Sequence, residues 1–436
     1  MNPLTIGAYL IGRREAILTV ARSRAALWIG LMFVFSAAFA REYDAEDLLR
    51  EPWYLFLPFA ASLLTSFILF VLIRYLLRAG HGLPFWSTFR SFLTLYWMTA
   101  PLAWLYAIPV ERFLSEAGAT NWNLNFLALV ALWRVVLITR VIVVTFGVNA
   151  FAASSVVLFF GDSVMLILLF LTPVPLINIM GGIPMSASDR IIGSTVMMLR
   201  FFGVLGWPVL MLLMLCFGSY FYTQPPPQSS DLTKVERGSK GAWIIAFCSL
   251  LIWLPLLPKP QAEQQRRTYV EDALLAGRIK AAINYMSERE RHDFPSLWDP
   301  PPKASYGKHE PPILDVIEVI IARDEKPWIL EVFLPKLRTA ASERYRYASF
   351  GEETEKPIPD FEVRLLHVLQ KLADQDVDIT RFEWTVKFAL TYLGDQATAA
   401  KKHGLKVTEK DKAIQAHFEK MLELIRQGNP RRIEQP

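Results

Sequence analysis

Cysteine and histidine are scarce in this chain of 436 residues, which has two of the first and six of the second. Cys216 and Cys248 both lie in apolar stretches, so the sequence predicts neither a disulfide framework nor a thiolate metal site. The histidines form no H-E-x-x-H motif, and the chain contains no P-loop, no G-x-G-x-x-G and no G-x-S-x-G motif. We therefore expect a protein that is not an enzyme and that carries no cofactor and no metal ion.

Charged residues are also few, at 20% of the chain, whereas hydrophobic residues make up 53%. Their division along the chain is uneven. Residues 1–258 hold 17 Lys and Arg against 12 Asp and Glu, whereas residues 259–436 hold 29 of each kind. The whole positive excess therefore lies in the apolar half, which is typical of basic loops on the cytoplasmic side of a membrane. The same distribution argues against a nucleic-acid-binding surface.

The apolar half contains seven segments with the composition of transmembrane helices, which need about 20 apolar residues to cross a bilayer. They lie at about 25–40, 52–77, 92–110, 126–146, 152–171, 201–222 and 243–257. The sequence therefore predicts an all-α fold. A bundle of about seven helices within residues 25–258 spans the lipid bilayer, and a soluble helical domain follows at residues 259–436.

Two flanking segments differ from ordinary spans. Residues 1–24 place apolar side chains on one helical face and arginines elsewhere, which predicts an amphipathic helix on the membrane surface. Residues 191–200 extend the sixth span beyond one untilted crossing, so we expect an interfacial or re-entrant segment there. The tripeptide Ala38-Phe39-Ala40 also fits a signal-peptide cleavage site, and a cleaved N-terminus is the second interpretation of this region.

The charges of the loops predict the orientation of the bundle. The loop at residues 41–51 is acidic, whereas Arg74, Arg78 and Arg90 flank the next loop. The positive-inside rule then places the N-terminus in the cytoplasm and, after seven spans, residues 259–436 outside. A span counted wrongly would reverse the side of that domain. We expect the protein in a cell membrane, the cytoplasmic membrane of a bacterium.

The second half has the pattern of a folded helical domain. Apolar residues recur at helical spacing in four stretches, at residues 313–321, 361–372, 382–393 and 414–425. A domain of about 170 residues is large enough to bury a core of its own. We expect residues 259–436 to bind a protein partner.

Three charged residues lie within the fourth and fifth spans: Arg134, Arg140 and Asp162. If the chain turns near residues 147–151, Asp162 lies about 4.5 Å along the helix axis from the depth of each arginine. Charges within hydrocarbon are costly and need a partner or water. One interpretation is an ion pair that fixes the register of the hairpin at residues 125–171. The other is a polar site for an ion, a proton or an anionic lipid headgroup.

The stretch LALVALWR, residues 127–134, follows closely spaced spans and a cytosolic N-terminal segment. In this respect residues 1–172 resemble the Yip1-like superfamily of polytopic membrane proteins. The segments at 40–53 and 293–302 resemble those of bacterial integral membrane proteins. The last two spans and the domain at 259–436 depart from that superfamily's usual short chain.

The resemblance implies a non-enzymatic role in membrane organisation or partner recruitment. We therefore expect a membrane scaffold whose helical domain binds a protein. The alternative is a transporter, or a transporter subunit, with a polar site between the helices of the hairpin at residues 125–171.

Overall fold

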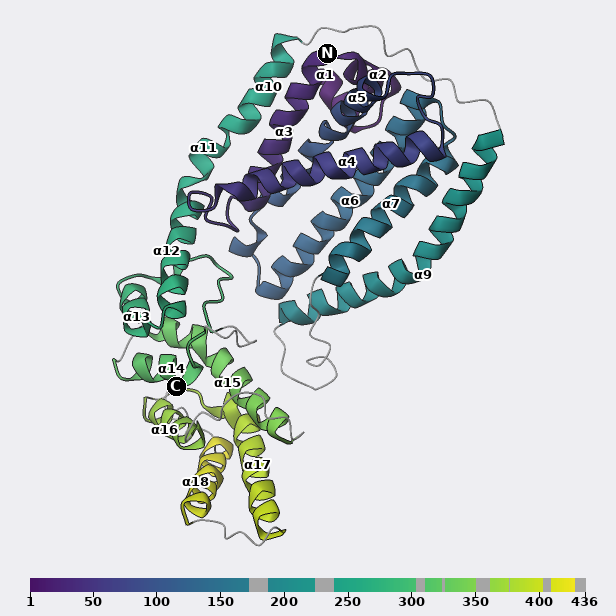
Figure 1. The fold of residues 1–436 in the computed structure, drawn as a ribbon. Helices are drawn as coiled ribbons and strands as arrows, with labels where there is room; N and C mark the ends of the chain where they lie inside the picture. The colour runs from purple at the N-terminus through teal and green to yellow at the C-terminus, as the bar shows by residue number, and fades with distance from the viewer. Residues whose placement is uncertain are drawn as a thin grey trace. The chain divides into compact units, whose positions relative to one another are not determined.

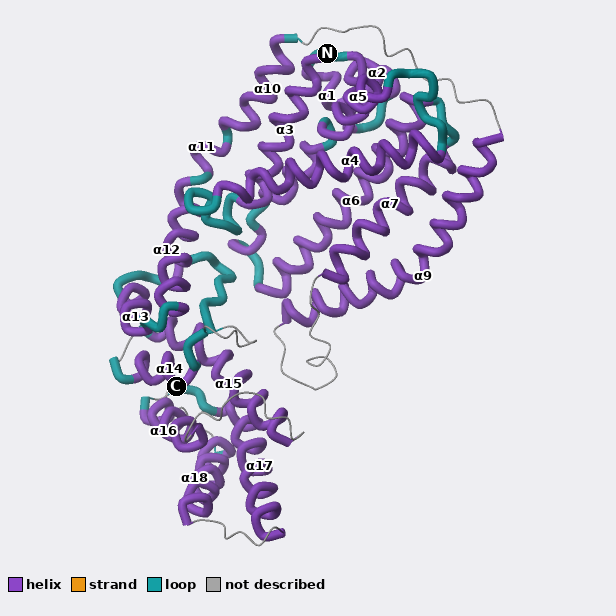
Figure 2. The backbone as a smooth tube through the Cα atoms, in the orientation of Figure 1, coloured by secondary structure: helices purple, strands orange, loops and turns teal. Residues whose placement is uncertain are grey.

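The computed structural model describes residues 1–171, 187–223, 239–302, 310–323, 326–349, 361–375, 377–402 and 409–427. All regular secondary structure in these ranges is helical, which confirms the predicted all-α fold (Figures 1 and 2). The chain divides into two compact units at the boundary between Gln265 and Arg266. We call them the membrane unit and the C-terminal unit, and each is built around hydrophobic clusters of its own.

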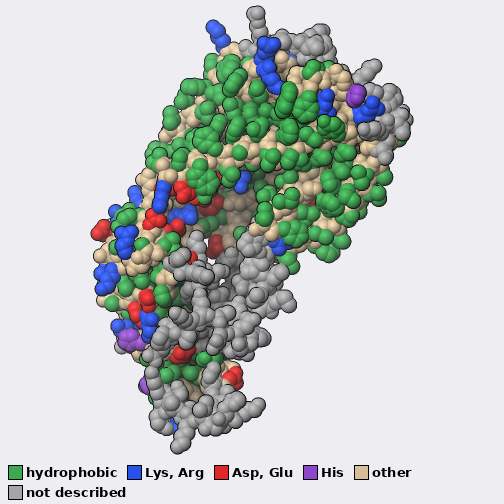
Figure 3. All heavy atoms as spheres, in the orientation of Figure 1, with side chains coloured by type: hydrophobic (Ala, Val, Ile, Leu, Met, Phe, Trp, Pro, Cys, Tyr) green, Lys and Arg blue, Asp and Glu red, His purple; other side chains and the backbone are tan. Residues whose placement is uncertain are grey.

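The membrane unit contains the apolar helices. They are α1 (Pro3–Leu10), α2 (Arg14–Arg22), α3 (Arg24–Glu42), α4 (Phe56–Leu76), α5 (Phe85–Trp97), α6 (Glu116–Phe146), α7 (Ala150–Leu171), α9 (Ala187–Thr223), α10 (Lys240–Leu251), α11 (Trp253–Leu256) and the first part of α12 (Pro258–Leu275). Short 3-10 helices η1 (Pro52–Leu55), η2 (Ala100–Ala107) and η3 (Val110–Arg112) join them. Hydrophobic side chains cover much of the face that Figure 3 shows.

Six of the described helical segments are long and apolar enough to cross a membrane. A seventh crossing arises if α10 and α11 are counted with α12, which is bent from them by 54°. The third crossing is irregular: α5 ends at Trp97, and the chain continues through the 3-10 helix η2, which begins beside Pro101. Proline lacks an N–H group and so interrupts the α-helical hydrogen-bond ladder. The chain is a multi-pass membrane protein.

Helix α3 lies beside the seventh crossing, and the two run in the same direction (Figure 1). The backbone N–H of Ser239 donates to the Met1 carbonyl at 2.8 Å, so α10 begins beside the N-terminus. Further along, Ser36 Oγ donates to the Ser249 carbonyl at 2.6 Å and accepts from Trp253 Nε1 at 3.1 Å. Helix α12 therefore leaves the membrane unit at the end opposite the N-terminus.

The N-terminal segment differs from the expected surface helix. It forms two helices, α1 and α2, that turn at Gly12, whose φ of +76° favours glycine. The side chains of Tyr9, Ile17 and Val20 are fully buried in the core of the membrane unit. The apolar face that the sequence assigns to lipid is instead covered by neighbouring helices, because α2 packs against α5 and α6.

The sixth crossing also differs from its expectation. Residues 191–200 are not a separate interfacial segment, because α9 runs without a break from Ala187 to Thr223. Pro208 lies inside this helix without ending it. A helix of this length extends about 55 Å, which exceeds the hydrocarbon thickness of a bilayer.

The C-terminal unit begins within α12, and its described residues include six further α-helices. They are α13 (Ile279–Ser287), α14 (Ile313–Ile321), α15 (Pro327–Ser349), α16 (Phe361–Asp374), α17 (Glu383–Lys402) and α18 (Glu409–Arg426). Its core contains the predicted apolar stripes, with Ile317, Leu365, Phe382 and Phe418 each fully buried. Val270 and Leu274 of α12 belong to the same core.

Candidate functional site

Arg134, the first of the three predicted site residues, lies in α6 and faces the third crossing. Its guanidinium carbon is 5.4 Å from the centre of the Tyr96 ring, a distance at which a cation is attracted to an aromatic face. Its neighbour Trp133 donates from Nε1 to the Leu10 carbonyl at 2.9 Å. Residues 133 and 134 thus attach α6 to α1 and α5.

Arg140 lies six residues further along α6 and is exposed. Its Nε donates a long hydrogen bond of 3.5 Å to the carbonyl of Gly12, at the turn between α1 and α2. A Cβ atom on Gly12 would lie 3.4 Å from the Arg140 Cγ. Arg140 therefore reaches the end of the membrane unit where the N-terminus lies.

Asp162 lies at the middle of α7 and faces α9. Its Oδ1 would be 3.0 Å from a Cβ atom on Gly203, and its Oδ2 is buried without a hydrogen-bond partner in the described chain. The next residue, Ser163, accepts a hydrogen bond of 3.0 Å from Trp207 Nε1 of α9. Asp162 thus belongs to the interface between α7 and α9.

The structure does not bring the three predicted site residues together. Helices α6 and α7 form the expected hairpin, which turns at Gly147 with φ of +67°. Among the described residues, however, no ion pair joins Asp162 to Arg134 or Arg140. Spacing along the chain gives the depth of each residue, whereas the rotation of each helix decides which neighbour a side chain faces. A functional role for these residues stays a prediction.

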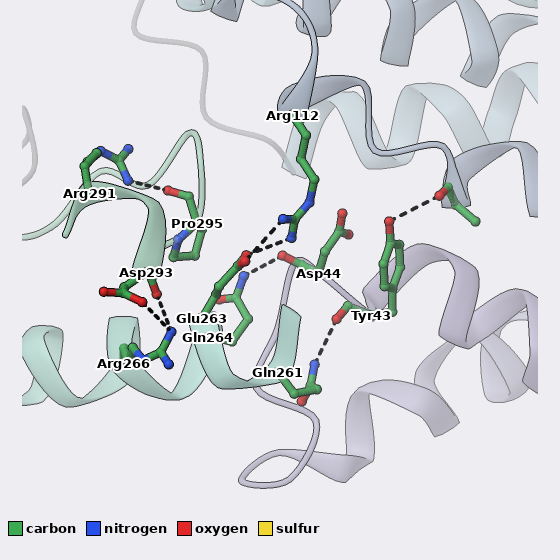
Figure 4. A network of polar contacts seen from close by, with 11 residues as sticks. Tyr43, Asp44, Arg112, Gln261, Glu263, Gln264, Arg266, Arg291, Asp293 and Pro295 are labelled. Carbon is green, nitrogen blue, oxygen red and sulfur yellow. Dashed lines mark hydrogen bonds and ion pairs between the residues drawn. The ribbon is translucent and has the colours of Figure 1, made fainter. Parts of the chain in front are cut away.

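A second polar cluster, which the sequence did not indicate, surrounds the start of α12 (Figure 4). Gln261 is 5% exposed and donates from Nε2 to the carbonyls of Tyr43 and Glu46, at 2.9 Å each. Its Oε1 accepts from the backbone N–H of Leu48 at 2.8 Å. Gln264 also donates to the carbonyl of Asp44. One face of α12 therefore satisfies the backbone of the loop that follows α3.

Glu263, which lies between these two glutamines in the sequence, forms an ion pair with Arg112 (Figure 4). Beside this pair, burial raises the pKa of Asp44 to about 6, and the Glu111 carboxylate acts in the same direction. We call Asp44, Arg112, Gln261, Glu263 and Gln264 the α12 anchor. The sequence does not indicate the role of Gln261, Glu263 and Gln264, because the polar stretch PKPQAEQQRR, residues 258–267, has the pattern of a solvated helix. The one feature of the sequence that could have indicated buried contacts here is the location of this stretch directly after an apolar span.

The C-terminal unit carries a third cluster, between α14 and α16. Arg364 donates to both carboxylate oxygens of Glu318, at 2.8 and 2.9 Å, and to Asp315 at 2.5 Å. These hydrogen bonds raise the pKa of Arg364 further above its ordinary value. In the described parts of the chain, no group of three His, Cys, Asp or Glu side chains has the arrangement of a metal site.

The fold and these clusters define a polytopic membrane protein with a helical domain attached. No protein-family model, curated protein or solved structure matches the chain. The resemblance to the Yip1-like superfamily therefore stays a prediction.

Proposed function

We propose that the chain is a non-enzymatic membrane scaffold whose C-terminal unit recruits a protein partner. The observation that carries this proposal is the double attachment of α12. Its first part is held on the membrane unit by Gln261, Glu263 and Gln264, which are 3–5% exposed. Its second part contributes Val270 and Leu274, both fully buried, to the core of the C-terminal unit. Helix α12 itself runs from Pro258 to Leu275.

The composition of the C-terminal unit also supports recruitment. It has its own hydrophobic core, and its surface carries exposed aromatic side chains, of which Trp384 is 68% exposed. Trp384 lies opposite the buried face of α17, where Val386 and Ala389 belong to the core. Exposed tryptophan is enriched among the residues that dominate protein–protein binding energy.

We also propose that the N-terminus is cytoplasmic and the C-terminal unit external, in a bacterial cytoplasmic membrane. Basic residues begin three helices of the membrane unit: Arg14 begins α2, Arg24 begins α3, and Lys240 begins α10 beside Met1. The opposite end, from which α12 departs, carries acidic residues in the loop at 43–51. The positive-inside rule favours this orientation. A reporter fused after residue 436 and active only in the cytosol should be inactive; activity there would overturn the orientation.

Site-specific photocrosslinking in intact cells tests recruitment. A photoreactive side chain replaces Trp384 or Lys420 in the C-terminal unit, and Val209 or Leu212 in α9 serves as the control position. The proposal predicts a discrete protein adduct from at least one C-terminal position and lipid adducts from the controls, because Val209 and Leu212 are exposed on an apolar helix. Lipid or solvent adducts alone from all four positions would overturn recruitment.

A second candidate function, transport, is favoured by one observation: the buried Asp162 Oδ2 has no hydrogen-bond partner in the described chain. An ionisable side chain within a span that lacks a partner marks an ion or proton pathway by default. The site then lies between α7 and α9, since Asp162 faces Gly203, and not between the helices of the hairpin.

Reconstitution into liposomes with a trapped pH-sensitive dye tests this alternative. Transport predicts that an imposed pH gradient decays faster with the protein than without it, and that Asp162→Asn abolishes the difference. Ser163→Ala is the neighbouring control and should leave the decay unchanged. Equal decay with the parent protein and with empty liposomes would contradict proton transport.

A further inference from the structure

A groove in the C-terminal unit lies between α13 and α14. Its volume is about 480 Å³, and it is lined by Ile279, Lys280, Asp315, Glu318, Val319, Ala322 and Arg323. The apolar side chains come from both helices, and charged side chains accompany them. A volume of this size lies in the range of ordinary ligand pockets, about 300–1,000 Å³.

Within the described part of the chain, the acidic side chains that line the groove have an ion-pair partner, whereas the basic ones do not. Arg364 of α16 binds both acids, Asp315 and Glu318, through three hydrogen bonds. The two remaining cations, Lys280 and Arg323, are exposed, and neither side chain has an ion-pair partner among the described residues. Arg364 offsets one of the two negative charges, so Arg364, Lys280 and Arg323 together exceed the two carboxylates by one positive charge beside the apolar surface.

We propose that this groove binds an acidic peptide segment of the recruited partner, with aliphatic side chains on the apolar surface and carboxylates at Lys280 and Arg323. This inference rests on the proposed recruitment function. Charge complementarity selects the occupant, because an anionic segment gains two ion pairs and a basic segment would meet uncompensated cations. The aliphatic side chains are required because Ile279, Val319 and Ala322 present only hydrocarbon.

Fluorescence anisotropy with the full-length protein in mild detergent tests the groove directly. The probe is a short labelled peptide of alternating glutamate and leucine. Two comparison peptides replace leucine by serine or glutamate by lysine. We expect the glutamate–leucine peptide to bind at least about tenfold more tightly than either comparison peptide, because each of them loses one of the two complementary features.

The double variant Lys280→Glu with Arg323→Glu should weaken binding of the glutamate–leucine peptide by about tenfold or more, since two attractive ion pairs become two repulsive contacts. Lys420→Glu changes an exposed lysine of α18 away from the groove and should leave affinity unchanged. Unaltered thermal unfolding of the double variant shows that the loss comes from the groove.

Equal affinity of the parent and the double variant, or equal affinity for the leucine and serine peptides, would overturn the groove proposal. The failure of the groove and the failure of recruitment are distinguishable. A partner adduct in photocrosslinking that survives the double variant leaves recruitment standing and removes the groove. Peptide binding that depends on Lys280 and Arg323, without any partner adduct, would support the binding chemistry of the groove and contradict the recruitment function.

Discussion

Arg112 and Glu263 form a two-pronged ion pair between residues 151 positions apart in the sequence. Arg112 Nη1 donates to Glu263 Oε1 at 3.2 Å, and Nη2 donates to Oε2 at 2.8 Å. The Glu263 side chain is 6% exposed, and that of Arg112 is 29% exposed. This geometry makes the pair the strongest single contact of the α12 anchor, because bidentate, partly desolvated pairs exceed surface pairs in energy.

Replacing Glu263 by alanine should destabilise the membrane unit by about 2–3 kcal/mol, since it leaves the partly desolvated Arg112 guanidinium without its partner. The measurement is the free energy of unfolding in mixed micelles as the mole fraction of denaturing detergent rises. Arg41→Ala is the control, because the Arg41–Glu42 pair has an arginine that is 68% exposed, and it should change stability by less than about 0.5 kcal/mol. An equal effect of both variants would contradict the role of the anchor.

Asp44 should make the membrane unit depend on pH. Its pKa is raised to about 6 by burial, with Glu111 adding to the effect and Tyr43 and Arg112 opposing it. An unfolded aspartate titrates near pH 4, so the folded state binds the proton more tightly. This contribution to stability should therefore fall as pH rises from about 4 to about 6 and then remain constant.

The variant Asp44→Asn should remove this slope and, at pH 7, raise the free energy of unfolding by about 1–2 kcal/mol after allowance for partial exposure. The nearby Asp47→Asn should give no such gain, because the Asp47 carboxylate accepts from the backbone N–H groups of Leu49 and Arg50. Parallel pH profiles for the parent and Asp44→Asn would contradict the assignment.

Asp162 should show no energetic coupling to the arginines of α6. Because no ion pair joins it to Arg134 or Arg140, Asp162→Asn leaves no cation without a partner. We expect a change in stability below about 1 kcal/mol, in contrast to the larger loss that breaking a buried pair causes. Double-mutant cycles that combine Asp162→Asn with Arg134→Gln or Arg140→Gln should give coupling energies below about 0.5 kcal/mol. A larger coupling would restore the ion pair predicted from the sequence.

A β-branched side chain at Gly203 should crowd the side chains that α7 packs against α9. A Cβ atom there would lie 2.8 Å from Leu166 Cδ2 and 2.9 Å from Met165 Cε, whereas at Gly206 nothing lies within 4 Å. Gly203→Val should therefore cost about 1–3 kcal/mol through overpacking, and Gly206→Val should be tolerated. Detergent-unfolding curves of the two variants provide the comparison; equal curves would refute a tight seam at Gly203.

The sequence predicted the features that depend on long apolar runs. The all-α class and the approximate places of the spans follow from such runs, and the stripe around Phe382 predicted a core face of α17. The sequence did not predict the features that depend on how each helix is rotated about its axis and on which helices it contacts. Asp162 faces α9 because the rotation of α7 about its axis turns this side chain toward Gly203. Residues 1–24 are partly buried because α5 and α6 cover their apolar face.

The α12 anchor was hidden for a different reason. Gln261 and Gln264 lie in a polar stretch that is typical of a solvated helix. Only the fold brings the backbone carbonyls of Tyr43 and Asp44 within hydrogen-bonding distance of them. Buried backbone groups need partners, and the loop after α3 finds them in a segment more than 200 positions away. A local pattern does not contain that information.

The central claim is that the membrane bundle and the helical domain are separately folded, because each has its own hydrophobic core. The most direct measurement is the thermal unfolding of residues 262–428 expressed alone, followed by circular dichroism. The account predicts a soluble, helical fragment with a single cooperative transition. An insoluble fragment, or helix content that declines gradually without a transition, would contradict it, since the core would then need the membrane unit to be complete.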